Sequence, residues 1–381
     1  MSKQSGADVP SAGSAGEAPA PQSMGTNLSM IKTVSPDSIE RELRDVWEQM
    51  AHPSTGESQQ AVVRACVLNL VIYSPDKNDE SSLTQTVAET STNHPGRILI
   101  LSGANPSDNP PEIDASVNAL CHFQPGGRKQ VCCEQILIRS TTEGMPLVPG
   151  IVLPLLIPDL PVILWWRTNL DLKHPLFEDL LDAATRIVFD SSQWQRSIGD
   201  LADFIAHEKQ WTAFSDFNWA RLTSWRILIS GFFDLPDCRQ CLKEIERVEI
   251  EYAGDSLPAE VYLLIGWLAS RLKWEMTSAQ ETAFTFQSGN HRIQTDVRRL
   301  QTGLPGVHSI KIHIGGAAHP YVEVRRAEDR LYLEHSFAGT AAAANPIRLA
   351  DPSESHILSG ELEIAGHDRV YEDAISYFAK R

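Results

Sequence analysis

Two cysteines near the middle of the chain have the spacing of a redox or metal-binding motif. Cys238 and Cys241 form a CxxC pair, which can lower a thiol pKa or supply half of a zinc site. A structural zinc site needs about four ligands, and no second CxxC or close histidine pair follows in the sequence. We therefore expect no metal ion. The pair is either a redox-regulated dithiol or two ordinary cysteines at the start of a helix.

Three charged residues beside apolar strands could form an anion site. Open α/β sheets bind ligands beyond the carboxyl ends of their strands, and Arg167 and Asp190 each follow an apolar run typical of a strand. Arg97 stands beside another such run. For both arginines we favour the alternative, an ion pair with a carboxylate at a strand end. Asp190 and the two serines after it can equally form a turn whose side chains bond local backbone groups.

The motifs of the common catalytic and nucleotide-binding classes are missing from the sequence. No GxGxxG follows the first apolar strand at Tyr73, and no GxxxxGK[ST], GxSxG, HExxH or HxxEH is present. These motifs supply phosphate cradles, activated serines and zinc ligands. We therefore expect no catalytic residues and no cofactor.

Charge and composition limit the classes of binding partner and the cellular compartments that we expect for this protein. The chain has 381 residues with 33 basic and 49 acidic side chains, a formal net charge of −16, which repels nucleic acid and anionic membranes. Its start lacks a secretory signal, so we expect a soluble cytoplasmic protein whose six cysteines are thiols. The apolar run 147–166 contains four prolines and an aspartate, which indicates buried structure and not a membrane helix.

Composition and periodicity divide the chain into three parts. Residues 1–34 are rich in serine, glycine, alanine and proline, so we expect a disordered tail that can be deleted without loss of stability. Residues 35–208 alternate strands and helices and predict an α/β domain. Residues 209–381 predict a C-terminal α+β domain of helices packed on an antiparallel sheet.

The expected N-terminal sheet is mixed. Apolar runs at 65–73 and 97–101 flank a helical segment, which predicts a βαβ unit with parallel strands. Strands at 117–123 and 131–139 are joined by a short Pro-Gly-Gly turn, which predicts an antiparallel hairpin.

The C-terminal part begins with helices and continues with alternating strands. Residues 259–272 are apolar on almost every side, which places that helix in the middle of the domain. Beyond it, isoleucines at 310, 312 and 314 alternate with polar residues, which predicts strands with one wet face.

Aromatic residues cluster where the two expected domains meet. Trp211, Phe214 and Phe217 lie close together in the sequence, and aromatic side chains commonly anchor protein interfaces. We take these three as the candidate partner-binding residues. Core packing is the alternative for each of them.

Several longer motifs resemble one family. They include the proline-rich run 149–161 (PGIVLPLLIPDLP) followed by Trp165-Trp166, the segment 216–222 (DFNWARL), and the segment 266–272 (GWLASRL). Together with the shorter motifs at 64–70, 94–97 and 133–136, this order is similar to the OpcA family, whose members are called glucose-6-phosphate dehydrogenase assembly proteins.

The resemblance implies a non-enzymatic bacterial protein. Members of the family bind glucose-6-phosphate dehydrogenase, favour its active oligomer and activate it in the oxidative pentose phosphate pathway. The alternative is a sugar-phosphate hydrolase or isomerase with Arg97, Arg167 and Asp190 as its site, which a close cluster of these groups in an open cleft would favour.

Overall fold

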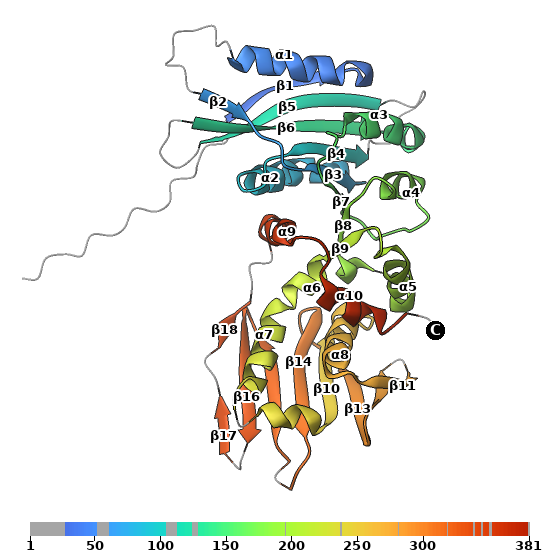
Figure 1. The fold of residues 1–381 in the computed structure, drawn as a ribbon, viewed down its shortest axis with the longest axis vertical. Coiled ribbons are helices and arrows are strands. Elements are labelled where there is room, and N and C mark those ends of the chain that lie inside the picture. The colour runs from blue at the N-terminus through green and yellow to red at the C-terminus, as the bar shows by residue number, and fades with distance from the viewer. Residues whose placement is uncertain are drawn as a thin grey trace, which may run out of the picture.

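The computed structural model describes residues 27–379, except 52–60, 104–112, 124–128, 195, 237, 281, 318, 338–339, 344–345 and 350–352. Two nine-stranded sheets organise this part of the chain (Figure 1). No helix in the described ranges is long and apolar enough to cross a membrane.

The first sheet has the strand order β1-β5-β6-β4-β3-β7-β8-β9, with β2 paired to β6. Six neighbouring strands, β6-β4-β3-β7-β8-β9, run parallel to one another, and β2 also pairs parallel to β6. Numbered along the chain, the six have the 3-2-1-4-5-6 order of the doubly wound dinucleotide fold. The strands are β1 (Asn27–Val34), β2 (Ala61–Arg64), β3 (Asn69–Ser74), β4 (Arg97–Gly103), β5 (Ile113–Phe123), β6 (Lys129–Ser140), β7 (Val162–Trp166), β8 (Arg186–Phe189) and β9 (Ala213–Asp216).

Helices cover both faces of this sheet. One face packs on α1 (Ile39–Ala51), α3 (Val148–Leu155), α4 (Pro175–Leu181) and α5 (Ile198–Glu208). The other packs on α2 (Glu80–Ser91) and on α9 (Glu354–Glu363), which returns from the far end of the chain (Figure 1). Strands buried on both sides need apolar residues at nearly every position, which explains the continuous apolar runs of β3 and β4.

The second sheet is antiparallel except for one parallel pair, β10 with β13. Its order is β11-β12-β13-β10-β14-β15-β16-β17, with β18 paired to β16. The strands are β10 (Ile245–Ala253), β11 (Glu275–Ala279), β12 (Ala283–Ser288), β13 (His291–Arg299), β14 (Gly306–Ile314), β15 (Tyr321–Ala327), β16 (Arg330–Phe337), β17 (Thr340–Ala343) and β18 (Ile347–Arg348).

Four helices connect or cover the second sheet: α6 (Phe217–Arg221), α7 (Thr223–Phe233), α8 (Ala259–Leu272) and α10 (Arg369–Ser376). The almost wholly apolar α8 lies in the middle, between the sheet and α10, and α10 also contacts α5 (Figure 1). The predicted architecture is therefore confirmed: an α/β part with a mixed sheet, and then helices on an antiparallel sheet.

Strand pairing and helix packing cross two boundaries expected from the sequence. Residues 27–34 form β1, which pairs antiparallel with β5, so the tail does not extend to residue 34. Deleting 1–34 would remove an edge strand, whereas dispensability of 1–26, which lie outside the described residues, stays a prediction. Two elements beyond the expected border after residue 208 also pack with the first part: β9 belongs to the first sheet, and α9 packs on α2.

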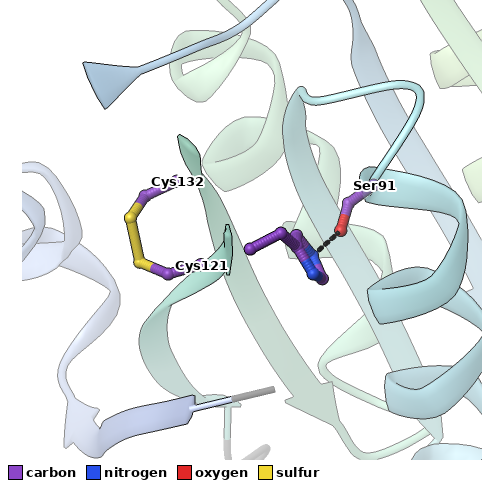
Figure 2. Close-up of a disulfide and its surroundings, with 4 residues drawn as sticks. Ser91, Cys121 and Cys132 are labelled. Carbon is purple, nitrogen blue, oxygen red and sulfur yellow. Dashed lines mark hydrogen bonds between the residues drawn. A yellow bond between two sulfur atoms is a disulfide. The ribbon is translucent and has the colours of Figure 1, made fainter. Parts of the chain in front are cut away.

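One disulfide corrects the expectation that all cysteines are thiols. Cys121 and Cys132 face each other on β5 and β6 and are bonded beneath α1, while Ser91 lies beyond the other side of these strands (Figure 2). The adjacent Cys133 packs on the opposite face, as strand geometry predicts. Which cysteines are bonded to each other cannot be deduced from their spacing in the sequence alone.

Titration of the free thiols tests for this disulfide. We expect four thiols in denatured, unreduced protein and six after reduction, and reduction should lower the free energy of unfolding by about 3 kcal/mol, the entropy of an 11-residue loop. The control Cys66→Ser should remove one thiol and leave the effect of reductant unchanged. Six thiols before reduction would contradict the bond.

Candidate functional site

Two aspartates mark the carboxyl ends of β8 and β9. Asp190 follows β8 and accepts a hydrogen bond from the backbone N–H of Ser192 at 3.0 Å, the turn expected as the alternative to a site. Asp216 ends β9 and caps α6: its Oδ1 accepts from the N–H of Asn218 at 3.0 Å and from that of Ser191 at 2.9 Å. Both carboxylates thus begin the segments that lead away from the first sheet.

Arg221, one turn further along α6, neutralises Asp190. Its Nη1 donates to Oδ1 at 3.0 Å, and its Nη2 lies 2.8 Å from Oδ2. Burial alone would lower the pKa of Arg221, but the hydrogen bond and charge of Asp190 outweigh it, and the pKa is raised. The sequence-predicted Asp190 is therefore an ion-pair partner.

A cleft of about 640 Å³ opens beside this ion pair. Its walls come from α6, α7, α8 and the β14–β18 region, and it lies where the carboxyl ends of β8 and β9 lead into the second sheet. The lining residues are Asn218, Arg221, Leu222, Trp225, Glu260, Gly306, Val307, Arg326, Glu328, Asp329, Arg348 and Leu349. Its size and mixed lining are typical of a small-molecule site.

The carboxyl of Asp216, beside the cleft, has a strongly raised pKa. Burial, and then the charge of Asp190, raise its pKa from 3.8 to about 7. Burial, and then the charge of Asp216, raise the pKa of Tyr371. Below about pH 7 the neutral form of the Asp216 carboxyl is thus favoured in the folded protein.

Asp216→Asn should change the pH dependence of stability. Because the folded-state pKa is raised, the contribution of Asp216 is fully present below about pH 4 and is lost as the pH rises through about 7. Asparagine stays neutral and keeps the accepting oxygen, so the stability of the variant relative to the parent should rise across this window. The rise is at most about 1.4 kcal/mol per pH unit.

Urea unfolding at about pH 5 and about pH 8 measures this difference. Asp255→Asn, at a fully exposed side chain, controls for the loss of one negative charge. An Asp216→Asn difference that is the same at both pH values would contradict the raised pKa.

The side chain of Arg97 is held by buried ion pairs and hydrogen bonds within the fold. Its Nε donates to Glu134 at 2.7 Å, and its Nη1 donates to Glu40 at 2.7 Å and to the carbonyl of Leu155 at 2.6 Å. Burial opposes the charged form of Arg97, but Glu134 and Glu40 outweigh it and raise the pKa. The favoured interpretation, an ion pair at a strand end, is confirmed.

Arg167 is likewise paired and lies far from Arg97 in the sheet. Its Nη1 donates to Asp79 at 2.8 Å, and its Nη2 donates to Glu354 on α9 at 2.7 Å. Arg97 begins β4, whereas Arg167 follows β7, and both strands run parallel to β3. Arg97 therefore lies at the amino ends of these parallel strands, and Arg167 lies at their carboxyl ends. Together with Asp190, they do not form the proposed anion site.

The crevice between β3 and β7 does not suit a dinucleotide. In this topology the pyrophosphate sits at the switch point, over a glycine-rich turn. Here a short 3-10 turn after β3 places Asp79 there, bonded to Ser74 and Arg167. Glu354 from α9 accepts from the Nη2 of Arg167 with both carboxylate oxygens. Carboxylates thus stand where phosphates would need free N–H groups.

The three aromatic residues expected to bind a partner differ in their exposure to solvent. Phe214 is 0% exposed and Phe217 is 2% exposed, so neither reaches a partner and both are corrected to core residues. Alternation on β9 and the cap at α6 turn them to opposite faces of the first sheet. Trp211 is 75% exposed and stays a candidate.

The CxxC pair is buried and not disulfide-bonded. Cys238 and Cys241 are 4% and 7% exposed, and burial raises the pKa of Cys241. A raised pKa opposes the reactive thiolate, so the ordinary-cysteine interpretation is favoured. Within the described ranges, no group of three or more histidine, cysteine or acidic side chains is placed to hold a metal ion.

Two family models match most of the chain. Residues 87–205 match the glucose-6-phosphate dehydrogenase subunit N-terminal domain, and residues 212–375 match the corresponding C-terminal domain. The chain belongs to the OpcA family. The motifs at 149–161, 216–222 and 266–272 all fall inside these matches.

Curated relatives carry the same family name. The OxPP cycle protein OpcA of Synechocystis sp. is 30% identical over 246 residues, 64% of this chain and 48% of the relative. That of Nostoc punctiforme is 32% identical over 221 residues, 58% of this chain and 47% of the relative. The chain thus spans about half the length of these relatives.

Solved structures are similar only at a distance. A levoglucosan dehydrogenase in complex with NADH and L-sorbose is 10% identical, with a TM-score of 0.44, over 83% of this chain and 91% of that one. A 3-ketoreductase from Actinomadura kijaniata is 9% identical, with a TM-score of 0.45, over 82% and 94%. At these scores we draw no conclusion from the likeness.

Three cleft residues were missed from the sequence: Arg221, Glu260 and Arg326. Arg221 lies within the OpcA-like segment 216–222, which is the signal that could have found it. Glu260 and Arg326 come from α8 and β15 and carry no local motif. Only the packing of these elements brings them to one cleft.

Proposed function

We propose that this protein is a non-catalytic cytoplasmic assembly factor and activator that binds glucose-6-phosphate dehydrogenase and favours its active oligomer in the oxidative pentose phosphate pathway. The match of both halves of the chain to models described as subunits of that dehydrogenase carries the proposal. The names of the curated relatives place them in the same pathway.

The described geometry supports a regulator over the enzyme alternative. A sugar-phosphate hydrolase or isomerase was expected to show Arg97, Arg167 and Asp190 clustered in an open cleft. Instead, each of the three is held by an ion pair. Arg97 lies at the amino ends of the parallel strands, whereas Arg167 lies at their carboxyl ends. The specific site on which the alternative rested is absent from the described residues.

Activation must come from a difference in affinity. A ligand shifts an equilibrium only by binding one state more tightly than the other. A difference of roughly 1–3 kcal/mol changes the apparent substrate affinity by roughly 5- to 150-fold, and the substrate must tighten the protein complex by the same factor. Activation should therefore saturate as this protein is added.

The test is a titration into the dehydrogenase from the same cell. Rate against substrate is recorded at increasing amounts of this protein, and the affinity of the complex is measured with and without glucose 6-phosphate. Saturating activation and equal coupling in both directions support the proposal. Absence of both binding and kinetic change would overturn it, and turnover of a sugar phosphate by this chain alone would favour the enzyme alternative.

Trp211 is the residue we place at the interface. Its exposed ring follows α5 and precedes β9, and an aromatic side chain in this position can fill a partner pocket. Trp211→Ala should weaken the complex and leave the melting temperature unchanged. Leu304→Ala, at another exposed apolar side chain, is the matched control and should leave the affinity unchanged.

A further inference from the structure

The cleft beside α6 is not used by the proposed function. Its volume of about 640 Å³ falls in the range of sites for small molecules. Leu222, Trp225, Val307 and Leu349 form an apolar wall, and charged side chains line the rest. This combination suits a ligand with both an apolar face and polar groups.

Arg326, near the end of β15, is an available cation in this cleft. It forms no ion pair with any residue in the described ranges, and its Nε donates only a long hydrogen bond of 3.4 Å to the carbonyl of Glu328. Arg221 and Arg348, in contrast, each have an aspartate partner. A guanidinium with free donors binds phosphate in a bidentate manner.

Glu260, on α8, offers the complementary acceptor. Its Oε2 is buried and has no hydrogen-bond partner among the described residues. Burial and the charge of Asp190 raise the pKa of Glu260. Buried oxygens without a donor are uncommon in native proteins, and a ligand hydroxyl would supply the missing donor.

The remaining carboxylates limit how anionic the ligand can be. Glu328 and Asp329 line the cleft as well, are exposed, and Asp329 is already paired with Arg348. Water screens exposed charges, so these groups weaken but do not prevent binding of a phosphate at Arg326. They favour a ligand that carries one anionic group and several hydroxyls over a polyanion.

We propose that this cleft binds a phosphorylated monosaccharide, with its phosphate at Arg326 and a sugar hydroxyl at Glu260. The C–H face of the sugar would lie along the apolar wall. Any effect of this ligand on the dehydrogenase rests on the proposed function, whereas binding to the isolated chain does not.

Isothermal titration of the full chain alone tests the proposal, with glucose 6-phosphate, glucose and inorganic phosphate as three separate probes. Glucose 6-phosphate should bind with a Kd below about 1 mM, and each of the other two should bind more weakly by at least about tenfold. Arg326→Ala should weaken glucose 6-phosphate about 10- to 100-fold, and Arg326→Lys should restore part of the loss. Glu260→Gln should weaken glucose 6-phosphate and leave inorganic phosphate unchanged.

Arg292→Ala is the matched control, because Arg292 is an exposed arginine on β13 outside the cleft. It should leave the affinity unchanged. No heat from glucose 6-phosphate, equal binding by Arg326→Ala, or equally tight binding of inorganic phosphate would each overturn the proposal. Binding of glucose 6-phosphate in this cleft without any interaction between the chain and the dehydrogenase would contradict the proposed function but support this inference.

Discussion

Replacing Glu134 by glutamine is expected to lower the free energy of unfolding by about 3–5 kcal/mol, because it leaves a buried arginine without its main counterion. Glu134 is 0% exposed on β6. Its Oε2 accepts from Arg97 at 2.7 Å, and its Oε1 accepts from the indole of Trp47 at 2.7 Å and lies 2.6 Å from Arg64. One carboxylate on β6 therefore links α1 to the sheet and contacts the start of the neighbouring strand β4.

Urea unfolding measures the loss, and two further variants identify its cause. Glu334→Gln breaks a half-exposed pair with Arg325 and should cost no more than about 1 kcal/mol. The double variant Arg97→Met with Glu134→Leu removes both buried charges and should lose less than Glu134→Gln alone. Equal costs for Glu134→Gln and Glu334→Gln would show that the buried pair carries no special weight.

Features that depend on neighbouring residues could be predicted from the sequence. Ser197 is of a residue type that favours the N-cap position, and its Oγ accepts from the N–H of Gly199 at 3.2 Å. Asp216, also a typical N-cap residue, caps α6. The alternating isoleucines of β14 do bury one face of an antiparallel sheet. Caps and periodicity are encoded within a few residues, so no knowledge of the tertiary fold is needed.

Features that depend on distant pairing could not be predicted. β1 lies in a segment whose composition indicates disorder, and its strand pairing is with β5, far along the chain. The Cys121–Cys132 bond depends on the register of β5 and β6, in which these two residues are partners. β9 joins the first sheet by parallel pairing with β8, although the helices around it suggested a new domain.

In the candidate site, too, local features could be predicted from the sequence and features that depend on the tertiary fold could not. Ion pairs for Arg97 and Arg167 were favoured because an arginine at a strand end needs a carboxylate, and both pairs exist. The cleft could not be foreseen, since its walls come from α6, α7, α8 and the end of the second sheet. Phe214 and Phe217 show the same limit, because aromatic residues suit cores and interfaces equally until burial is known.

Gly266→Ala is expected to cost several kcal/mol and to loosen the C-terminal helix. Gly266 lies in the middle of α8, where a Cβ would come within 2.1 Å of the carbonyl oxygen of Ala374 on α10. Overpacking of a core usually costs about 1–3 kcal/mol, and more where backbone must move. If α10 moves away, Tyr371 and Ile375, both 0% exposed, lose burial worth about 1.5–3 kcal/mol for each side chain.

Gly231→Ala separates this clash from the helix propensity of glycine. Gly231 is also inside a helix, α7, but a Cβ there meets no atom within 4 Å. Alanine at this exposed position should raise the free energy of unfolding by about 0.5–1 kcal/mol, because glycine is a poorer helix former. Urea unfolding should therefore shift in opposite directions for the two variants, and protease should cleave the C-terminal segment sooner only in Gly266→Ala. A shift of the same sign in both would mean that α8 and α10 adjust their spacing freely, and that close packing at Gly266 does not hold the C-terminal helix in place.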